Sequence, residues 1–238
     1  MTPNSDVQAA IEALRDATAR LEVAVDRCRA DGGHQAFAGP SRLPGWTIGH
    51  VVTHLARNAD GLRRVLVGAR VGQRLQPYDS PQARSADIER GATRSTDTIA
   101  VDLATADRHL AETIDTLSQT TWTAIVDLGR GGPAPADVVV AARLAEVELH
   151  HADLGVDDGL DLLDCDQAGA LLHALQHSYV RTREVPPMTL APGGGAPIDI
   201  RGGGPVVTGS ALELVRWLAG RGSAGVRSDG RLPDLPDW

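Results

Sequence analysis

The spacing of hydrophobic positions predicts that most of the chain up to about residue 155 is helical. Apolar residues recur every three or four positions from Val7 to Arg29 and from Ile48 to about Gly68. The same spacing runs from Ala83 to about Leu117 and from Val138 to Leu154. Between the second and third stretches, residues 73–84 contain two prolines and are expected to form a loop. Four long amphipathic helices joined by loops predict a helix bundle.

The pattern changes after Gly155. A helical period continues from Asp166 to about Glu184, and short apolar pieces split by glycines follow at 188–192, 197–204 and 205–209. Pieces of this length and spacing predict strands of a small sheet. Two polar residues are well placed to cap helices: Thr47 before Ile48, and Ser210 before a helix predicted over Ala211–Ala219.

These patterns predict a mainly α protein with two domains. Residues 1–157 would form the four-helix bundle, and residues 158–238 a small α+β domain. A chain of 238 residues is long enough for each part to bury a core of its own.

Composition narrows the classes of function. The net charge is −8 without a basic stripe, which argues against nucleic-acid binding and against docking on anionic lipid. No apolar run reaches the ~18 residues of a membrane helix, and the N-terminus does not resemble a secretory signal. Cys28 and Cys165 suggest no disulfide framework. We therefore expect a cytoplasmic protein without membrane or nucleic-acid partners.

All basic residues other than histidine are arginines, 23 in number. Arginine without lysine is typical of GC-rich genomes such as those of actinobacteria. The absence of lysine also excludes a mechanism through a lysine Schiff base.

Two helical stretches carry the residues that suggest chemistry. One contains His50 and His54, and the other contains four polar residues close together, Glu146, Glu148, His150 and His151. Residues four apart share a helix face, and a zinc site in a bundle needs nitrogen and oxygen ligands from facing helices. The helical periods place His54 nearer the bundle interior than His50. Glu148 is interpreted as solvated, and spacing alone does not choose between His150 and His151.

Several segments together resemble one known family. They are LPGWTIGHVVTHLARNADGL (43–62), PYDSPQARSADIERGA (77–92), AEVELHHADLG (145–155), VTGSALELVRWLAGRGSAGV (207–226) and the terminal PDLPDW. Their order and spacing resemble the mycothiol-dependent maleylpyruvate isomerases, within the DinB/YfiT-like superfamily of metal-binding bundles. The resemblance implies a DinB-like bundle with His54, Glu146 and His150 as metal ligands, and Arg221 as a catalytic residue of the C-terminal domain. His151 stands where the family pattern does not lead us to expect histidine.

The resemblance also implies an activity. The cofactor would be a divalent metal, for which two histidines and a glutamate suit zinc best, and mycothiol would be the thiol cosubstrate. Addition of the thiolate to the cis double bond of maleylpyruvate, rotation and loss of the thiol would give fumarylpyruvate. Arg221 would bind the carboxylates or the enolate, and Tyr78 and Arg84 are candidates to line a cleft between the two domains.

Two other functions stay open at the level of sequence. A related enzyme would transfer mycothiol to a different electrophile and release a thiol adduct. Alternatively, the chain would be a zinc-binding stress protein without enzymatic activity. The partners expected in any case are small molecules, and the protein is expected to be a monomer or a small homo-oligomer.

Overall fold

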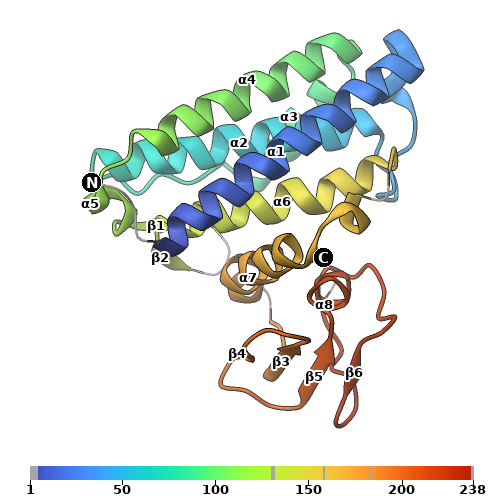
Figure 1. Ribbon diagram of the computed structural model, residues 1–238. Helices are drawn as coiled ribbons and strands as arrows, with labels where there is room; N and C mark the ends of the chain where they lie inside the picture. Colours follow the sequence, from blue (N-terminus) through green and yellow to red (C-terminus); the bar gives the residue numbers. More distant parts are fainter. Residues whose placement is uncertain (1–4, 130–131, 158, 183, 237–238) are drawn as a thin grey trace.

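Four long helices form a bundle that makes up one end of the molecule (Figure 1). The computed structural model describes residues 5–129, 132–157, 159–182 and 184–236. The bundle helices are α1 (Ser5–Gly32), α2 (Ile48–Arg70), α4 (Thr96–Asp115) and α6 (Val138–Leu154). Helix α2 packs against α4 and α6, and α1 packs against α6 and α4. The predicted mainly α fold with a helix bundle is confirmed, as is the cap at Thr47, whose side chain accepts a hydrogen bond from the His50 amide.

The prediction of one helix from Ala83 to about Leu117 was wrong. This stretch contains two helices, α3 (Pro81–Ala92) and α4, with Ser95 capping the second through the Thr98 amide. Helix α3 also begins inside the segment expected to be a loop, where Ser80 is its N-cap and Pro81 takes the first position. The apolar period continues across the break, so hydrophobic spacing alone did not reveal it.

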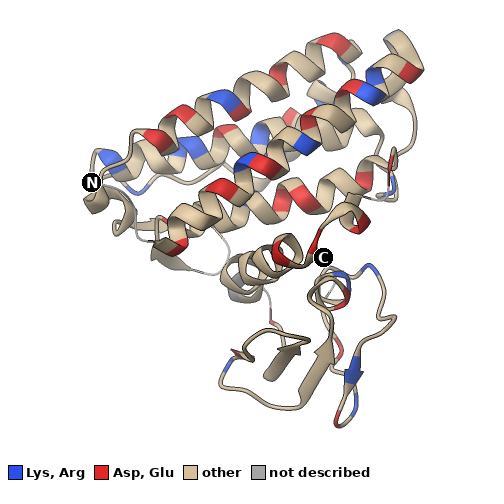
Figure 2. Cartoon of the chain, in the orientation of Figure 1, with Lys and Arg blue, Asp and Glu red and all other residues tan. Residues whose placement is uncertain are grey.

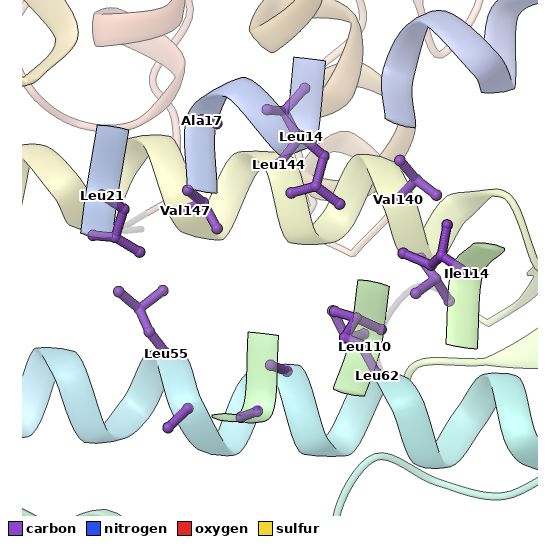
Figure 3. Packing of buried hydrophobic residues seen from close by; sticks show 14 of the residues in the cluster. Leu14, Ala17, Leu21, Leu55, Leu62, Leu110, Ile114, Val140, Leu144 and Val147 are labelled. Atoms are coloured by element: carbon purple, nitrogen blue, oxygen red, sulfur yellow. The ribbon is translucent and has the colours of Figure 1, made fainter. Parts of the chain in front are cut away.

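The bundle core forms where the four apolar stripes meet (Figure 3). Each stripe follows the helical period along one side of its helix, so packing the stripes together removes them from water. The side chains labelled in the figure come from all four helices: Leu14, Ala17 and Leu21 of α1, Leu55 and Leu62 of α2, Leu110 and Ile114 of α4, and Val140, Leu144 and Val147 of α6. A fully buried leucine or valine contributes about 1.5–3 kcal/mol relative to exposure.

Short elements connect the bundle helices. A 3₁₀ helix, η1 (Gly33–Ala38), follows α1, and a single helical turn, α5 (Gln119–Trp122), follows α4. A two-stranded antiparallel hairpin of β1 (Ile125–Asp127) and β2 (Pro133–Pro135) leads into α6. The hairpin was not predicted, because its strands have three residues each and β2 contains two prolines, which usually argue against a strand.

The C-terminal part is a small α+β unit (Figure 1). After the 3₁₀ helix η2 (Gly159–Leu162) and helix α7 (Cys165–Thr182), a four-stranded sheet has the order β4-β3-β5-β6. Strand β3 pairs in parallel with β5 and antiparallel with β4, and β6 pairs antiparallel with β5. The elements are β3 (Met188–Pro192), β4 (Ile198–Ile200), β5 (Val206–Gly209), α8 (Ala211–Leu218) and β6 (Arg227–Ser228). The three predicted strands and the helix capped by Ser210 are confirmed, and β6 was not predicted.

A second hydrophobic core joins this unit to the bundle. Ala145, Leu149 and Ala152 of α6 pack with buried residues of α7, the sheet and α8. Helix α6 therefore supplies residues to both cores. The domain boundary between residues 157 and 158 stays a prediction, and Asp158 lies outside the described residues.

Acidic and basic residues are interspersed along the bundle helices (Figure 2). Within the described residues, every helix is too short or too polar to cross a bilayer. Both cysteines are free thiols. Cys28 is buried, and this burial raises the pKa of its thiol to about 11, so the thiol stays protonated at neutral pH.

Candidate metal site and cleft

Three side chains that can bind a metal converge where α2 faces α6. His54 projects from α2, and Glu146 and His150 lie one turn apart on α6. Nε2 of His54 lies 2.9 Å from Oε2 of Glu146, and Nε2 of His150 lies 3.3 Å from the same oxygen. One ligand atom from each residue lies within 4.8 Å of the others. His54 and His150 are buried, whereas the Glu146 side chain keeps 29% of its surface exposed.

His50, four residues before His54, has a different role. Its Nδ1 accepts a hydrogen bond from the Thr47 amide at 3.2 Å, and its own amide donates to the Thr47 hydroxyl at 3.3 Å. This reciprocal pair is a capping box that begins α2. His50 is therefore held at the start of the helix, outside the group formed by His54, Glu146 and His150.

The structure separates the two adjacent histidines that spacing left undecided. His150 faces α2, while Nε2 of His151 lies 3.1 Å from Oδ1 of Asp157 and outside the three-residue group. His151 is 1% exposed, in agreement with its position on the apolar face of the helical wheel. Consecutive residues on a helix point about 100° apart, so only one of the two can face His54.

The interpretation of Glu148 as solvated was wrong. Glu148 is 2% exposed, and its Oε1 pairs with Nη2 of Arg20 on α1 at 2.5 Å. Helix α6 is covered by α1, α2 and α7, so it has no broad face left for water. The buried carboxylate is compensated by Arg20, although burial still raises its pKa.

A carboxylate that the sequence analysis did not single out supports His150 from behind. Oδ2 of Asp153 lies 2.8 Å from Nδ1 of His150 and 2.7 Å from Nη2 of Arg221. Arg221 also donates to the carbonyl oxygens of Ala219 and Leu149, at 2.9 and 3.4 Å. Asp153 lies three residues after His150 on α6, and this spacing was the signal available in the sequence.

Electrostatics give the three central residues different protonation states. Burial lowers the pKa of His54 to about 4, so this imidazole is neutral at neutral pH. Burial opposes ionisation of Glu146, but the hydrogen bonds and charges of the two imidazoles outweigh it and hold its pKa well below the ordinary value. Burial likewise opposes protonation of His150, but Asp153 and Glu146 raise its pKa. The centre is thus an anionic carboxylate between two imidazoles.

The donors suit a divalent metal. Two imidazole nitrogens and one carboxylate oxygen are a set found in catalytic zinc sites, where three protein ligands leave one position open. The hydrogen bond from Nδ1–H of His150 to Asp153 directs the other ring nitrogen, Nε2, toward Glu146 and His54, where it can bind an ion once it has lost its proton. The residues present therefore fit a zinc-type ion.

Arg84 contacts this centre from α3. Its Nη2 lies 3.1 Å from Nδ1 of His54, and since a guanidinium only donates, Nδ1 accepts and Nε2–H donates to Glu146. Binding of a metal through Nε2 would place the proton on Nδ1, and two donors would then face each other. Arg84 is half-buried, and its guanidinium carbon Cζ lies 5.7 Å from the centroid of the Tyr78 ring.

The three residues lie in a cleft of about 770 Å³. Its walls are mostly apolar and come from the loop before α2, the segment before α3, the β1–β2 hairpin and α6. Tyr78 and Arg84, the two residues predicted to line a cleft, both line it, and Arg84 is the one arginine among the described lining residues. The described lining residue with the highest number is Ser178 of α7. Arg221 contacts Asp153, which in turn contacts His150. Its role as a catalytic residue stays a prediction. The contribution of the C-terminal domain to the cleft also stays a prediction.

Comparisons with known proteins identify the family and agree with the overall fold. A family model described as the mycothiol maleylpyruvate isomerase N-terminal domain matches residues 14–155. None of the curated proteins matches the chain. Two crystal structures are similar to it, each 26% identical with 100% of both chains covered: a histidine-to-alanine mutant of the mycothiol-dependent maleylpyruvate isomerase, with a TM-score of 0.80, and that isomerase without the mutation, with 0.79. Because the family model spans more than half of its residues, this chain belongs to the mycothiol maleylpyruvate isomerase family.

Proposed function

We propose that this protein is a metal- and thiol-dependent cis–trans isomerase that converts maleylpyruvate to fumarylpyruvate with mycothiol as cosubstrate. The observation that carries the proposal is the convergence of His54, Glu146 and His150 in the cleft, in a chain whose family and structural neighbours are enzymes of this kind. The three residues would hold the metal, with zinc as the best match to the donors. When bound, such an ion lowers the pKa of a coordinated thiol and supplies a thiolate at neutral pH.

In this reaction the protein binds the substrate and the thiol and stabilises the negative charge that develops on the substrate. Sulfur bonds to the alkene carbon β to the ketone, and the electron pair of the double bond moves onto the ketone oxygen as an enolate. Rotation about the resulting single bond and return of the electron pair expel the thiolate and leave the trans alkene. No atom is gained or lost. The mostly apolar walls of the cleft would reduce the amount of water around the enolate.

Arg84 is placed to bind the negative charge of the substrate. Maleylpyruvate carries two carboxylates, and a guanidinium binds a carboxylate through two parallel hydrogen bonds. Release of Arg84 from Nδ1 of His54 when the metal binds would free its donors for the substrate. The proposal thus assigns substrate binding to Arg84 on the cleft wall.

The experiment is an assay of maleylpyruvate with the zinc-loaded protein, with and without mycothiol. We expect loss of the maleylpyruvate absorbance that requires mycothiol, and a product of unchanged mass. His54→Ala should abolish the activity, whereas His50→Gln on the same helix should retain it, because His50 lies outside the metal group. A product heavier by one mycothiol would identify a transferase instead. Absence of any thiol-dependent change in the zinc-loaded wild type would overturn the proposal.

A further inference from the structure

Asp153 bridges the candidate metal site and the C-terminal part of the chain. One oxygen, Oδ2, contacts both Nδ1 of His150 at 2.8 Å and Nη2 of Arg221 at 2.7 Å. Asp153 is 4% exposed, so these contacts replace the water that its carboxylate would otherwise bind. The three side chains form a continuous series from the metal group to the turn after α8.

The contact with His150 determines which nitrogen faces the metal group. A carboxylate accepts hydrogen bonds, so the contact with Asp153 keeps a proton on Nδ1 of His150 and leaves Nε2, which faces Glu146, as the nitrogen that gives up its proton to bind an ion. The same contact restrains rotation of the ring about its χ2 angle. Partners of this kind orient metal-binding histidines and raise their basicity.

Arg221 is fixed by the end of α8. The helix ends in a Schellman motif, in which the Arg221 amide donates to the Arg216 carbonyl at 2.7 Å and the Gly220 amide to the Trp217 carbonyl at 3.1 Å. Gly220 and Gly222 on either side of Arg221 have φ of 68° and 107°, values that glycine adopts readily. The turn directs the guanidinium to Asp153 and to the Leu149 carbonyl on α6.

We propose that Asp153 and Arg221 are positioning residues for the metal ligand His150, and that the C-terminal part of the chain thereby controls metal affinity. Asp153 acts on His150 directly, and Arg221 acts through Asp153 by compensating and orienting its buried carboxylate. This inference rests on the metal site of the proposed function. It gives Arg221 a task that requires no contact with the substrate.

The test measures zinc affinity of the metal-free full-length protein by competition with a chromogenic chelator, so that activity is not needed. Asp153→Ala should weaken zinc binding by about 10–100-fold, the usual range for loss of such a partner. Asp153→Asn keeps an acceptor oxygen for Nδ1–H and should retain most of the affinity. Arg221→Gln should weaken binding by about tenfold or more, and Arg221→Lys by less.

A double variant distinguishes a shared positioning role of Asp153 and Arg221 from two independent effects on zinc affinity. If Arg221 acts through Asp153, the protein with both Asp153→Ala and Arg221→Gln binds zinc no more weakly than Asp153→Ala alone. The visible spectrum of the cobalt-loaded Asp153→Ala protein should also change, because His150 is no longer fixed at the ion. A purely structural role would lower thermal stability and leave both readouts unchanged.

Matched controls are available in the chain. Asp157→Asn removes a carboxylate beside His151, which lies outside the metal group, and Arg216→Gln removes the ion pair of an α8 arginine with Asp161. Arg216 lies on α8 and Asp161 in η2, away from the metal group. Both variants should leave zinc affinity as in the wild type. If the wild type and Asp153→Ala bind zinc with equal affinity while His54→Ala binds it more weakly, this inference is overturned and the metal site is not. Equal affinity of wild type and His54→Ala would overturn the metal site and the proposed function with it.

Discussion

Three neighbouring side chains on α6 differ in role because of what each one contacts. His150 faces His54 on the neighbouring helix α2, His151 faces Asp157, and Glu148 faces Arg20. All three are buried, so none of them is a generic polar residue of a solvated face. At the scale of the residue, the partner of each polar side chain on α6 depends on the direction in which that side chain leaves the helix axis. This direction changes by about 100° from one residue to the next.

Arg84 offers the first test at this scale. In the zinc-loaded enzyme, Arg84→Gln should lower kcat/KM for maleylpyruvate by about 10–100-fold, since a lost hydrogen bond to a charged group costs about 1.5–3 kcal/mol. The zinc content should not fall, because Arg84 is not one of the three ligands, and its contact in the metal-free centre is with Nδ1 of His54 and not with the nitrogen that would bind the ion. The measurement is steady-state kinetics together with metal analysis.

The matched control for this prediction is on the same helix. Arg90→Gln replaces an arginine of α3 whose side chain is 71% exposed and pairs with Asp87, away from the cleft. Its kinetics should match those of the wild type. Equal loss of kcat/KM in the two variants would show that Arg84 has no specific contact with the substrate.

At the scale of the element, α6 is the helix on which the site depends. It packs against α1, α2 and α7, and it carries two of the three candidate ligands together with Asp153. Its position relative to α2 and α4 is held by Arg143, which is 1% exposed. The Arg143 guanidinium donates to the Leu55 carbonyl and Asn58 of α2, at 2.9 and 2.8 Å, and to Asp107 of α4 at 2.5 Å.

Loss of this contact should destabilise the bundle strongly. Arg143→Leu leaves the buried carboxylate of Asp107 without compensation, which costs about 3–5 kcal/mol of the free energy of unfolding. Chemical denaturation of the metal-free protein measures it. The exposed change Arg90→Leu should alter the free energy by no more than about 0.5 kcal/mol. A loss below about 1 kcal/mol for Arg143→Leu would mean that α2, α4 and α6 are held by apolar packing alone.

At the scale of the whole molecule, the two cores are coupled because α6 belongs to both. Leu144 and Val147 pack in the bundle core, while Ala145, Leu149 and Ala152 pack in the second core with α7, the sheet and α8. Unfolding of either core would expose apolar surface of this shared helix. The ion pair of Asp153 with Arg221 adds a polar link between the same two parts.

We therefore expect a single unfolding transition. Leu214→Ala, at a fully buried position of α8, should lower the stability of the whole protein by about 2–5 kcal/mol and shift one calorimetric peak to lower temperature. Leu162→Ala, at a side chain that is 54% exposed, serves as the control and should shift the peak little. Two separate peaks, of which Leu214→Ala moves one, would contradict the coupling.

The sequence by itself determined what depends on near neighbours along the chain. Hydrophobic spacing and capping residues located the long helices, α8 and three strands, because helical and extended periods are local properties. They did not locate the break between α3 and α4, since the apolar period of Ile88, Ala92 and Ile99 continues across it. The proposed ligands His54, Glu146 and His150 came from resemblance to a family, because spacing alone left His150 and His151 equivalent.

Only the tertiary structure decided what depends on residues far apart in the chain. It brought His54 of α2 to Glu146 of α6, buried Glu148 against Arg20, and joined Arg221 to Asp153 across 68 positions. The physical reason is the same in each case. The environment of a polar side chain is set by the elements that pack around it, and helical spacing states which side of a helix it occupies but not what faces that side.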